Sequence, residues 1–437
     1  MRRNLLLTAV LVTMVLVLVP MANADALDTG DISWVTTASA LVMLMTPAVG
    51  FFYAGLVRRK NLVATLFQCL ATFAAVSLVW TLWGYSLVFG PSIKGIIGDL
   101  SLAGLVGVGA QPDNNYASTI PAILLYFFQL KFAAITPALI IGAMAERINF
   151  RSLLIFIVLW ATVIYAPVAH WTWNVHGWLR SLGTIDFAGG IVVHIAAGLS
   201  ALAAALVIGR RKDADNGEFR PNNVPLVVLG ASLLWFGWFG FNGGSSLAAN
   251  TLAVSALVVT NLAAASAALS WMFVDWITKG KPTTVGLSIG AVCGLVAITP
   301  ASGYVGVFAS VLIGLIAGVV SNLVANWRTS RTTLDDSLDV FACHGVSGIW
   351  GSIATGLFAT LTINPTGKDG LFYGNPRQLL VQFIAVAVVA AYAFVGSYLL
   401  LKLIGVFTEM RVSPEEEEMG LDTSLHGEKA YVGDLDS

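Results

Sequence analysis

Charged residues are scarce in this chain, and their scarcity excludes an ordinary soluble globular protein. Only 11% of the 437 residues are Asp, Glu, Lys or Arg, whereas 57% are hydrophobic. A soluble domain carries roughly 25% charged residues, because it needs them to cover its surface. Lipid is therefore the expected solvent. The scattered Lys and Arg residues and the net charge of -1 offer no basic stripe for a nucleic acid.

Cysteine is also rare. The three cysteines, Cys69, Cys293 and Cys343, each lie within an apolar run. This placement argues against disulfides and against a cysteine-rich metal site. We expect three small buried side chains, and no metal or other cofactor.

The amino-terminal segment has the pattern of a secretory signal peptide. Arg2 and Arg3 precede an apolar run over residues 5–20, and Ala22, Asn23 and Ala24 follow it. A positive start, an apolar centre and an A-x-A end are typical of such signals. We expect residues 1–24 to be removed, with an uncleaved first helix as the alternative. The signal indicates a bacterial envelope protein whose mature amino terminus lies outside.

Eleven apolar segments follow, each near the length of about 20 residues that crosses a membrane as a helix. The fold class is therefore an all-α integral membrane protein, with a transporter domain over 25–403 and a tail over 404–437. The expected spans are 32–57, 62–89, 120–144, 152–171, 188–209, 225–246, 252–276, 283–299, 304–327, 341–362 and 379–403.

Lys and Arg are distributed unequally between the two sides. Loops after odd-numbered spans hold Arg58, Arg59, Lys60, Arg147, Arg151, Arg210, Arg211, Lys212, Arg220, Lys279, Lys281, Arg328 and Arg331. Loops after even-numbered spans hold only Lys94, Arg180, Lys368 and Arg377. Because cytoplasmic loops are enriched in Lys and Arg, we expect the amino terminus outside and the carboxyl terminus in the cytoplasm of a bacterial inner membrane. The acidic tail would be disordered or docked on the inner face of the bundle.

Two histidines lie deep inside expected spans, where ionisable groups are costly and are functional candidates. His194, in the fifth span, and His344, in the tenth, are each followed four residues later by glycine, Gly198 and Gly348. Small residues on the histidine face let another helix approach closely. Spans five apart run in opposite directions, as two inverted five-helix halves with a final helix would produce.

Other readings of the histidines remain. Each could bond a backbone carbonyl in an unrelated place, or the pair could hold haem in a redox enzyme. The remaining histidines, His170, His176 and His426, are expected in an external loop and in the tail.

Aromatic residues give a second signal. Phe128 and Phe132 share a helix face, and Phe241 lies among glycines. Ring faces attract a desolvated cation, although such rings more often pack in a core or against lipid. Asp186, just before the fifth span, is interpreted as a helix cap rather than a cation attractor. Lys131, between Phe128 and Phe132, is expected to snorkel outward, and no function follows from it.

At these residues the chain resembles the ammonium transporter (Amt/Mep/Rh) family, especially its bacterial Amt branch. The similar stretches, in chain order, are FFQLKFAAITPALIIGAMAERINF (127–150), DFAGGIVVHIAAG (186–198), GWFGFNGGSS (237–246), KPTTVGLSIGAVCGLVAITPASGYVG (281–306), DVFACHGVSGIWG (339–351) and GLDTSLHGEKAY (420–431).

The resemblance implies a homotrimer of eleven-helix channels, not enzymes, that carry ammonium. It implies a gate of Phe132 and Phe241, and an outer ammonium site of Phe128, Trp173 and Ser245. It further implies a pore histidine pair, His194 and His344, with Asp186 as a supporting structural acid. The resemblance also implies net charge movement, and regulation by a PII-type signal protein at the cytoplasmic face.

The implied mechanism has a physical reason. A bare cation in an apolar pore is costly, but ammonium can release a proton and enter as ammonia, which potassium cannot do. Neutral imidazoles offer a donor and an acceptor each to guide it. An Rh-like channel with uncharged flux and a sensor of ammonium are the alternatives. For the sensor, the tail after residue 403 is expected to be too short for a folded output domain.

Overall fold

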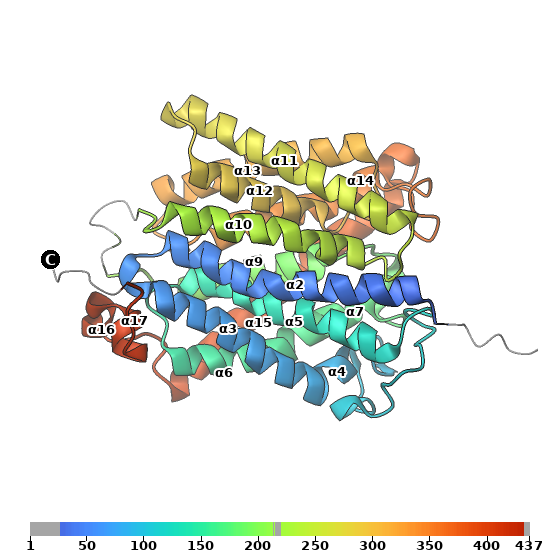
Figure 1. Ribbon diagram of the computed structural model, residues 1–437, viewed down its shortest axis with the longest axis horizontal. Coiled ribbons are helices and arrows are strands. Elements are labelled where there is room, and N and C mark those ends of the chain that lie inside the picture. Colours follow the sequence, from blue (N-terminus) through green and yellow to red (C-terminus); the bar gives the residue numbers. More distant parts are fainter. Residues whose placement is uncertain (1–26, 213, 215–219, 432–437) are drawn as a thin grey trace, which may run out of the picture.

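The computed structural model describes residues 27–212, 214 and 220–431, and in them the chain forms a bundle of near-parallel helices (Figure 1). The expected signal peptide lies outside the described residues. The α-helices are α2 (Thr29–Leu56), α3 (Leu62–Val79), α4 (Tyr85–Phe89), α5 (Ala122–Met144), α6 (Phe150–Trp160), α7 (Ala166–Trp173), α8 (Trp178–Leu182), α9 (Ala196–Ile208), α10 (Val224–Trp238), α11 (Thr251–Lys279), α12 (Thr284–Ile298), α13 (Val307–Arg331), α14 (Ser347–Phe358), α15 (Pro376–Phe407), α16 (Pro414–Met419) and α17 (Leu421–His426).

Wide π-helical turns join several of these helices into longer rods. They are η2 (Trp80–Gly84), η4 (Ala161–Tyr165), η5 (Gly190–Ile195), η6 (Phe239–Gly243) and η7 (Phe341–Val346). The short elements that remain are the 3₁₀ turns η1 (Arg59–Asn61), η3 (Ala103–Leu105) and η8 (Leu371–Tyr373), and a hairpin of β1 (Ser92–Ile93) with β2 (Ile97–Gly98).

In the described part of the chain, nine helical rods are long and apolar enough to cross a membrane. The two other expected spans, 283–299 and 341–362, correspond to the 15-residue helix α12 and to η7 with α14. Both segments are helical, but they are not among the nine long apolar rods. The helix α12 is short, and η7 with α14 carries a histidine among glycines. An all-helical membrane protein is therefore established, and the count of eleven spans stays a proposal.

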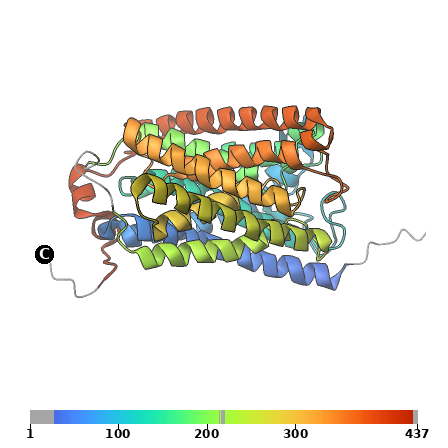
Figure 2. The same ribbon diagram turned by 90° about the horizontal axis from the view of Figure 1, so that it is seen from above.

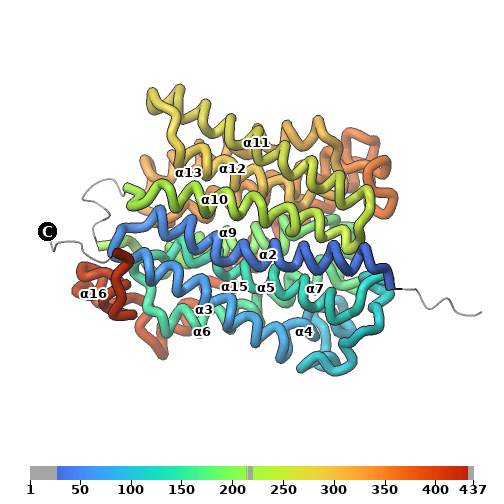
Figure 3. The backbone as a smooth tube through the Cα atoms, in the orientation of Figure 1, coloured from blue at the N-terminus to red at the C-terminus, as the bar shows by residue number. Residues whose placement is uncertain are grey.

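The helices are arranged in two groups along the bundle. The later helices, α11 to α14, lie together on one side of α10, and the earlier helices α3, α5 and α6 lie on the other (Figure 1). The view from above shows the same parallel packing, with α15 along one edge (Figure 2). The start of α2 and the pair α16 and α17 lie at opposite ends of the bundle (Figure 3). The start of the first span and the tail therefore lie on opposite sides of any membrane that the bundle crosses.

Small residues allow the close packing, as the composition indicates. A Cβ atom added to Gly294 on α12 or to Gly314 on α13 would lie only 2.3 Å or 2.1 Å from the carbonyl oxygen of Ala263 on α11. No side chain fits into these gaps without movement. Backbone contact of this kind gives membrane helices the van der Waals packing that hydrophobic exclusion cannot supply in lipid.

The tail is docked on the bundle, which was one of the two expectations for it. The last long helix continues to Phe407, four residues beyond the expected boundary at 403, because Ile404, Val406 and Phe407 prolong the apolar run. Arg411 then donates hydrogen bonds to the carbonyls of Ile208 and Arg210 after α9.

Two further contacts hold the tail. Asp422 accepts a hydrogen bond from the backbone N–H of Ala64 at the start of α3. Arg411 also pairs with Glu417, whose second oxygen accepts from the backbone N–H of Lys212. The tail therefore contacts loops that lie far apart in the sequence.

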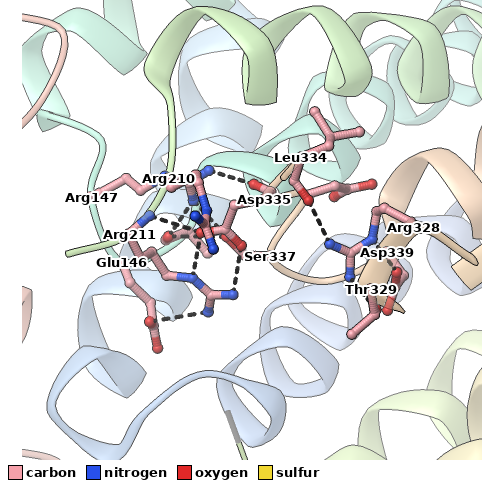
Figure 4. A network of polar contacts seen from close by, with 12 residues as sticks. Glu146, Arg147, Arg210, Arg211, Arg328, Thr329, Leu334, Asp335, Ser337 and Asp339 are labelled. Atoms are coloured by element: carbon pink, nitrogen blue, oxygen red, sulfur yellow. Dashed lines mark hydrogen bonds and ion pairs between the residues drawn. The ribbon is translucent and has the colours of Figure 1, made fainter. Parts of the chain in front are cut away.

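A polar network joins three loops, at residues 145–147, 209–211 and 335–337 (Figure 4). Arg147, which is fully buried, donates to the carbonyls of Ala145, Gly209 and Asp335. Arg211 pairs with both Asp335 and Glu146. Burial opposes ionisation of Asp335, but hydrogen bonds from Arg211 hold the pKa of this carboxyl at about 2. The network fixes the end of α9 against the start of η7.

Candidate functional site

The two histidines meet at the centre of the bundle. His194 lies in η5 and His344 in η7, and their Nδ1 atoms are 3.3 Å apart. Both side chains are buried. The glycines that follow them make this possible, because a Cβ atom on Gly198 would lie 2.1 Å from the backbone nitrogen of Gly345. A Cβ on Gly348 would lie 3.1 Å from Cβ of His194.

A pair of stacked rings lies above the histidines. The ring centroids of Phe132 and Phe241 are 4.2 Å apart with 29° between the ring planes. Phe241 in turn contacts His194, with 6.0 Å between the centroids. The glycines beside Phe241 are required, since a Cβ atom on Gly240 would lie 2.6 Å from Cβ of Leu41.

The stacked rings separate two cavities of very different size. The outer cavity has a volume of about 470 Å³ and is lined by Phe132, Trp173 and Ser245, among others. The inner cavity, of about 10 Å³, is lined by Phe241 and both histidines. That volume holds about one water-sized molecule. A solute that moves from the outer to the inner cavity must pass between the rings and lose its hydration shell.

Of the three residues expected for the outer site, two line the outer cavity and one does not. Trp173 and Ser245 line the outer cavity, and the Ser245 hydroxyl donates to the Phe241 carbonyl, which leaves its own lone pairs available. Phe128 is fully buried behind Phe132, with 4.9 Å between the ring centroids, and lines neither cavity. Its contact with the outer cavity is therefore indirect.

Asp186 caps the helix that carries His194. Its carboxylate accepts hydrogen bonds from the backbone N–H groups of Gly189, Gly190, Ile191 and Val192 at 2.7–3.1 Å. Its carbonyl oxygen accepts from the Trp173 indole at 3.1 Å. One residue thus positions both the histidine helix and a ring of the outer cavity.

Asp336 is the counterpart of Asp186 and was not predicted from the sequence. Asp336 accepts from the backbone N–H groups of Val340 and Phe341, at the start of the turn that carries His344. Each aspartate precedes its histidine by eight positions, 186 to 194 and 336 to 344, and this spacing is readable in the sequence. Asp186 lies at the outer-cavity end and Asp336 beside the tail network, so the two histidine helices run in opposite directions.

Three site residues lie on π-helical turns, which were not predicted from the sequence. His194, His344 and Phe241 belong to η5, η7 and η6. Such turns insert one residue into a helix and are frequent at functional sites, because they turn side chains away from the regular helical face. Trp238 was also missed: its ring stacks on His194 at 5.4 Å, and its indole donates to Thr299.

Two expectations about single residues were wrong. His170 was expected in an external loop, but it lies in α7 and is fully buried, with its ring nitrogens bonded to Ser92 and to the Val88 carbonyl. Lys131 was expected to snorkel outward, but only 3% of the residue is exposed. Its ammonium group lies 3.5 Å from the centroid of the Phe127 ring, which supplies a cation–π contact.

No metal centre is formed within the described residues, because no three or more His, Cys, Asp or Glu side chains gather to hold an ion. The site is built from aromatic rings, imidazoles and one hydroxyl. It can strip water from a small cation, hold a neutral molecule and exchange a proton.

Comparison with known proteins gives consistent results over almost the whole chain. The family model described as Ammonium Transporter Family matches residues 33–431. An ammonium transporter of Bacillus subtilis is 46% identical over 402 residues, covering 92% of this chain and 98% of the relative. The ammonium transporter Amt1 of Archaeoglobus fulgidus is 47% identical over 403 residues, covering 92% and 99%.

Solved structures agree with these relatives. The crystal structure of Candida albicans Mep2 superposes with a TM-score of 0.84 at 37% identity, covering 89% of this chain and 88% of that one. A structure described as a sensor Amt protein has the same TM-score at 31% identity, covering 91% and 98%.

Proposed function

Because this chain belongs to the ammonium transporter family, we propose that it moves ammonium by deprotonating it at an outer aromatic site and conducting ammonia past the histidine pair. The observation that carries this proposal is the ring stack. Phe132 faces the large outer cavity, Phe241 faces the small inner one, and the rings are in contact. A hydrated ion cannot keep its shell across this step.

The outer site recruits the cation. Trp173 presents a ring and Ser245 presents hydroxyl lone pairs to the outer cavity. A ring face attracts a desolvated cation by roughly 0.5 to 2 kcal/mol. Phe128 supports this site from behind Phe132 and does not contact the cation itself.

The passage between the cavities selects against cations that cannot release a proton. Moving a bare ion into an apolar cavity of about 10 Å³ costs many kcal/mol without compensation. Potassium carries that cost in full, whereas ammonium leaves a proton behind and enters as a neutral molecule. Phe132 and Phe241 form the gate at which this happens.

The histidines guide ammonia and relay the proton. With both rings neutral, one Nδ1 donates and the other accepts across the 3.3 Å contact. The Nε2 atom of His194 is buried and has no protein partner, so it is available to the permeating molecule. We propose that the proton follows the ammonia along this pair, so that transport moves net charge.

The same proposal covers assembly and location. The protein is a homotrimer in a bacterial inner membrane, with two inverted five-helix halves and a final helix in each subunit. The opposite directions of the two histidine helices support the inverted halves. The Lys and Arg distribution supports a periplasmic amino terminus and a cytoplasmic tail. A PII-type signal protein would contact the cytoplasmic face, where the tail and Arg210, Arg211 and Lys212 lie.

Current recording on the purified protein in liposomes tests the mechanism. Ammonium pulses should produce inward current, whereas equal potassium pulses should produce none beyond that of protein-free liposomes. Ammonium uptake without current would replace the proposal with uncharged, Rh-like flux. Binding of ammonium without either uptake or current would favour a sensor, the role stated for one structural neighbour.

A further inference from the structure

Two cysteine thiols lie in contact beside the histidine pair. Sγ of Cys293, on α12, and Sγ of Cys343, on η7, are 3.4 Å apart. Both residues are buried, and all three cysteines of the chain are reduced. The third, Cys69 on α3, has no such partner among the described contacts and provides an internal reference.

The thiol pair adjoins the wall of the inner cavity. Cys343 directly precedes His344 in the chain, and Cys293 directly follows Val292. Both His344 and Val292 line the cavity. Cys343 is 6% exposed, whereas Cys293 is fully enclosed, so an oxidant that reaches the pair meets Cys343 first.

We propose that Cys293 and Cys343 form a redox site, in which a small neutral hydroperoxide links them as a disulfide and thereby slows transport. Hydrogen peroxide suits the access route, because it is uncharged and has only one heavy atom more than ammonia. The slowing of transport rests on the proposed function, whereas the formation of the disulfide does not.

The reaction balances without another reactant. The Cys343 thiol attacks the O–O bond of hydrogen peroxide, which gives a sulfenic acid and one water molecule. The Cys293 sulfur then attacks the sulfenic sulfur, forms the S–S bond and releases a second water molecule. Two thiols are oxidised, the peroxide is reduced, and the product is neutral, as an apolar site requires. Low exposure makes the first step slow.

The link would disturb the histidine contact. A disulfide has a bond of about 2.05 Å, so the two sulfurs must approach by more than about 1 Å. On its other side, the turn η7 packs directly against α9, because the backbone of Gly345 contacts Gly198. Movement of η7 toward α12 therefore draws His344 away from His194.

The test compares oxidised and reduced protein in four samples. Wild type, Cys293→Ala, Cys343→Ala and the control Cys69→Ala are reconstituted in liposomes and incubated with hydrogen peroxide, with and without later dithiothreitol. Ammonium uptake is measured, and non-reduced digests are searched by mass spectrometry for a peptide linking residues 293 and 343. Each variant is compared with its own untreated uptake, so a variant with lower basal transport stays informative.

We expect the linked peptide and a loss of uptake of up to about a hundredfold in wild type and Cys69→Ala, since a misplacement of 1 Å can cost that much. Dithiothreitol should reverse both, and the other two variants should keep their uptake. Absence of the linked peptide, a linked peptide with unchanged uptake, or equal losses in all four samples would each overturn the inference. Absent uptake in untreated wild type would instead contradict the proposed function.

Discussion

The Nδ1 atoms of His194 and His344 face each other at 3.3 Å, and the Nε2 atom of His194 has no protein partner. In this arrangement only one of the two facing nitrogens carries a hydrogen, since two N–H groups would repel. The pair is thus a donor and acceptor couple whose direction reverses when both rings change tautomer.

Substituting His194 by Asp tests whether the pair enforces passage as a neutral molecule. We expect His194→Asp to retain ammonium transport and to pass potassium, because a fixed carboxylate compensates an intact cation. Opposite charges 4 Å apart gain about 4 kcal/mol even at an effective dielectric constant of 20. Potassium current in liposomes should exceed the protein-free background at least tenfold, and about 4 kcal/mol allows an increase of up to roughly a thousandfold.

The matched control is His194→Asn, which has nearly the same shape as the Asp variant but no charge. It should not conduct potassium. If a folded His194→Asp protein transports ammonium and still rejects potassium, the histidines are not the element of selectivity.

Removal of the inner gate ring tests the separation of the two cavities. Phe241→Ala should lower ammonium transport about tenfold, because the dry contact between the rings, where the proton is released, is lost. Phe236→Ala is the control, since Phe236 lies on α10 and is 53% exposed. Uptake assays should leave that control at wild-type rates. Normal rates for Phe241→Ala, with oligomer assembly intact, would remove this ring from the pathway.

The outer site is tested by Trp173→Leu. Loss of one ring face should raise the half-saturating ammonium concentration about 2-fold to 30-fold, which corresponds to roughly 0.5 to 2 kcal/mol. Discrimination against larger amines should weaken as well. Trp276→Leu, at a half-exposed position on α11, should change neither quantity. If only the expression level changes, Trp173 is a packing residue.

The two capping aspartates should both contribute to stability and transport. Both carboxylate oxygens of Asp186 and of Asp336 accept from backbone N–H groups. Asp186→Asn and Asp336→Asn each keep only one acceptor oxygen, and leaving a buried N–H unpaired costs about 1 to 3 kcal/mol. Asp186→Asn should lower Tm more, because Asp186 accepts four hydrogen bonds and Asp336 two. Thermal unfolding in detergent measures the difference. Asp28→Asn, at an exposed cap where Asn serves equally well, should leave Tm unchanged. The opposite order of the two variants would contradict this account of the caps.

Orientation in the membrane is tested by reporter fusions. A fusion that ends at Thr408 should be active only with a cytoplasmic reporter, and one that ends at Gly374 only with a periplasmic reporter. This follows from the excess of Lys and Arg in the loops after odd-numbered spans. Periplasmic activity at Thr408 would reverse the orientation.

Hydropathy predicted most of the membrane helices, and the resemblance named some of the residues that line the two cavities, among them Trp173, Phe241 and His194. Hydropathy predicted α2 and α15, because a long apolar run depends only on the residue types within that segment. The π-helical turns were not predicted, because a single inserted residue hardly changes the hydropathy pattern. Asp336 was missed although its spacing to His344 equals that of Asp186 to His194.

Contacts between segments that are distant in the chain could not be predicted from the sequence. The burial of Phe128 behind Phe132, and the position of Lys131 over Phe127, depend on the rotation of α5 against its neighbours. An apolar helix without a polar face gives no sequence signal for that rotation. The docking contacts of the tail depend on backbone carbonyls, which every residue type possesses.

The docking of residues 411–422 also has a consequence for biosynthesis. These residues leave the ribosome after every long helix of the bundle has been made, yet Arg411 holds the carbonyls of Ile208 and Arg210, and Asp422 holds the N–H of Ala64. A partly translated chain therefore has its long helices in place before the tail contacts Ile208, Arg210 and Ala64. The network of Arg147, Arg211 and Asp335 can form before the tail is made, so a truncated chain would lack only the contacts of the tail with the loops.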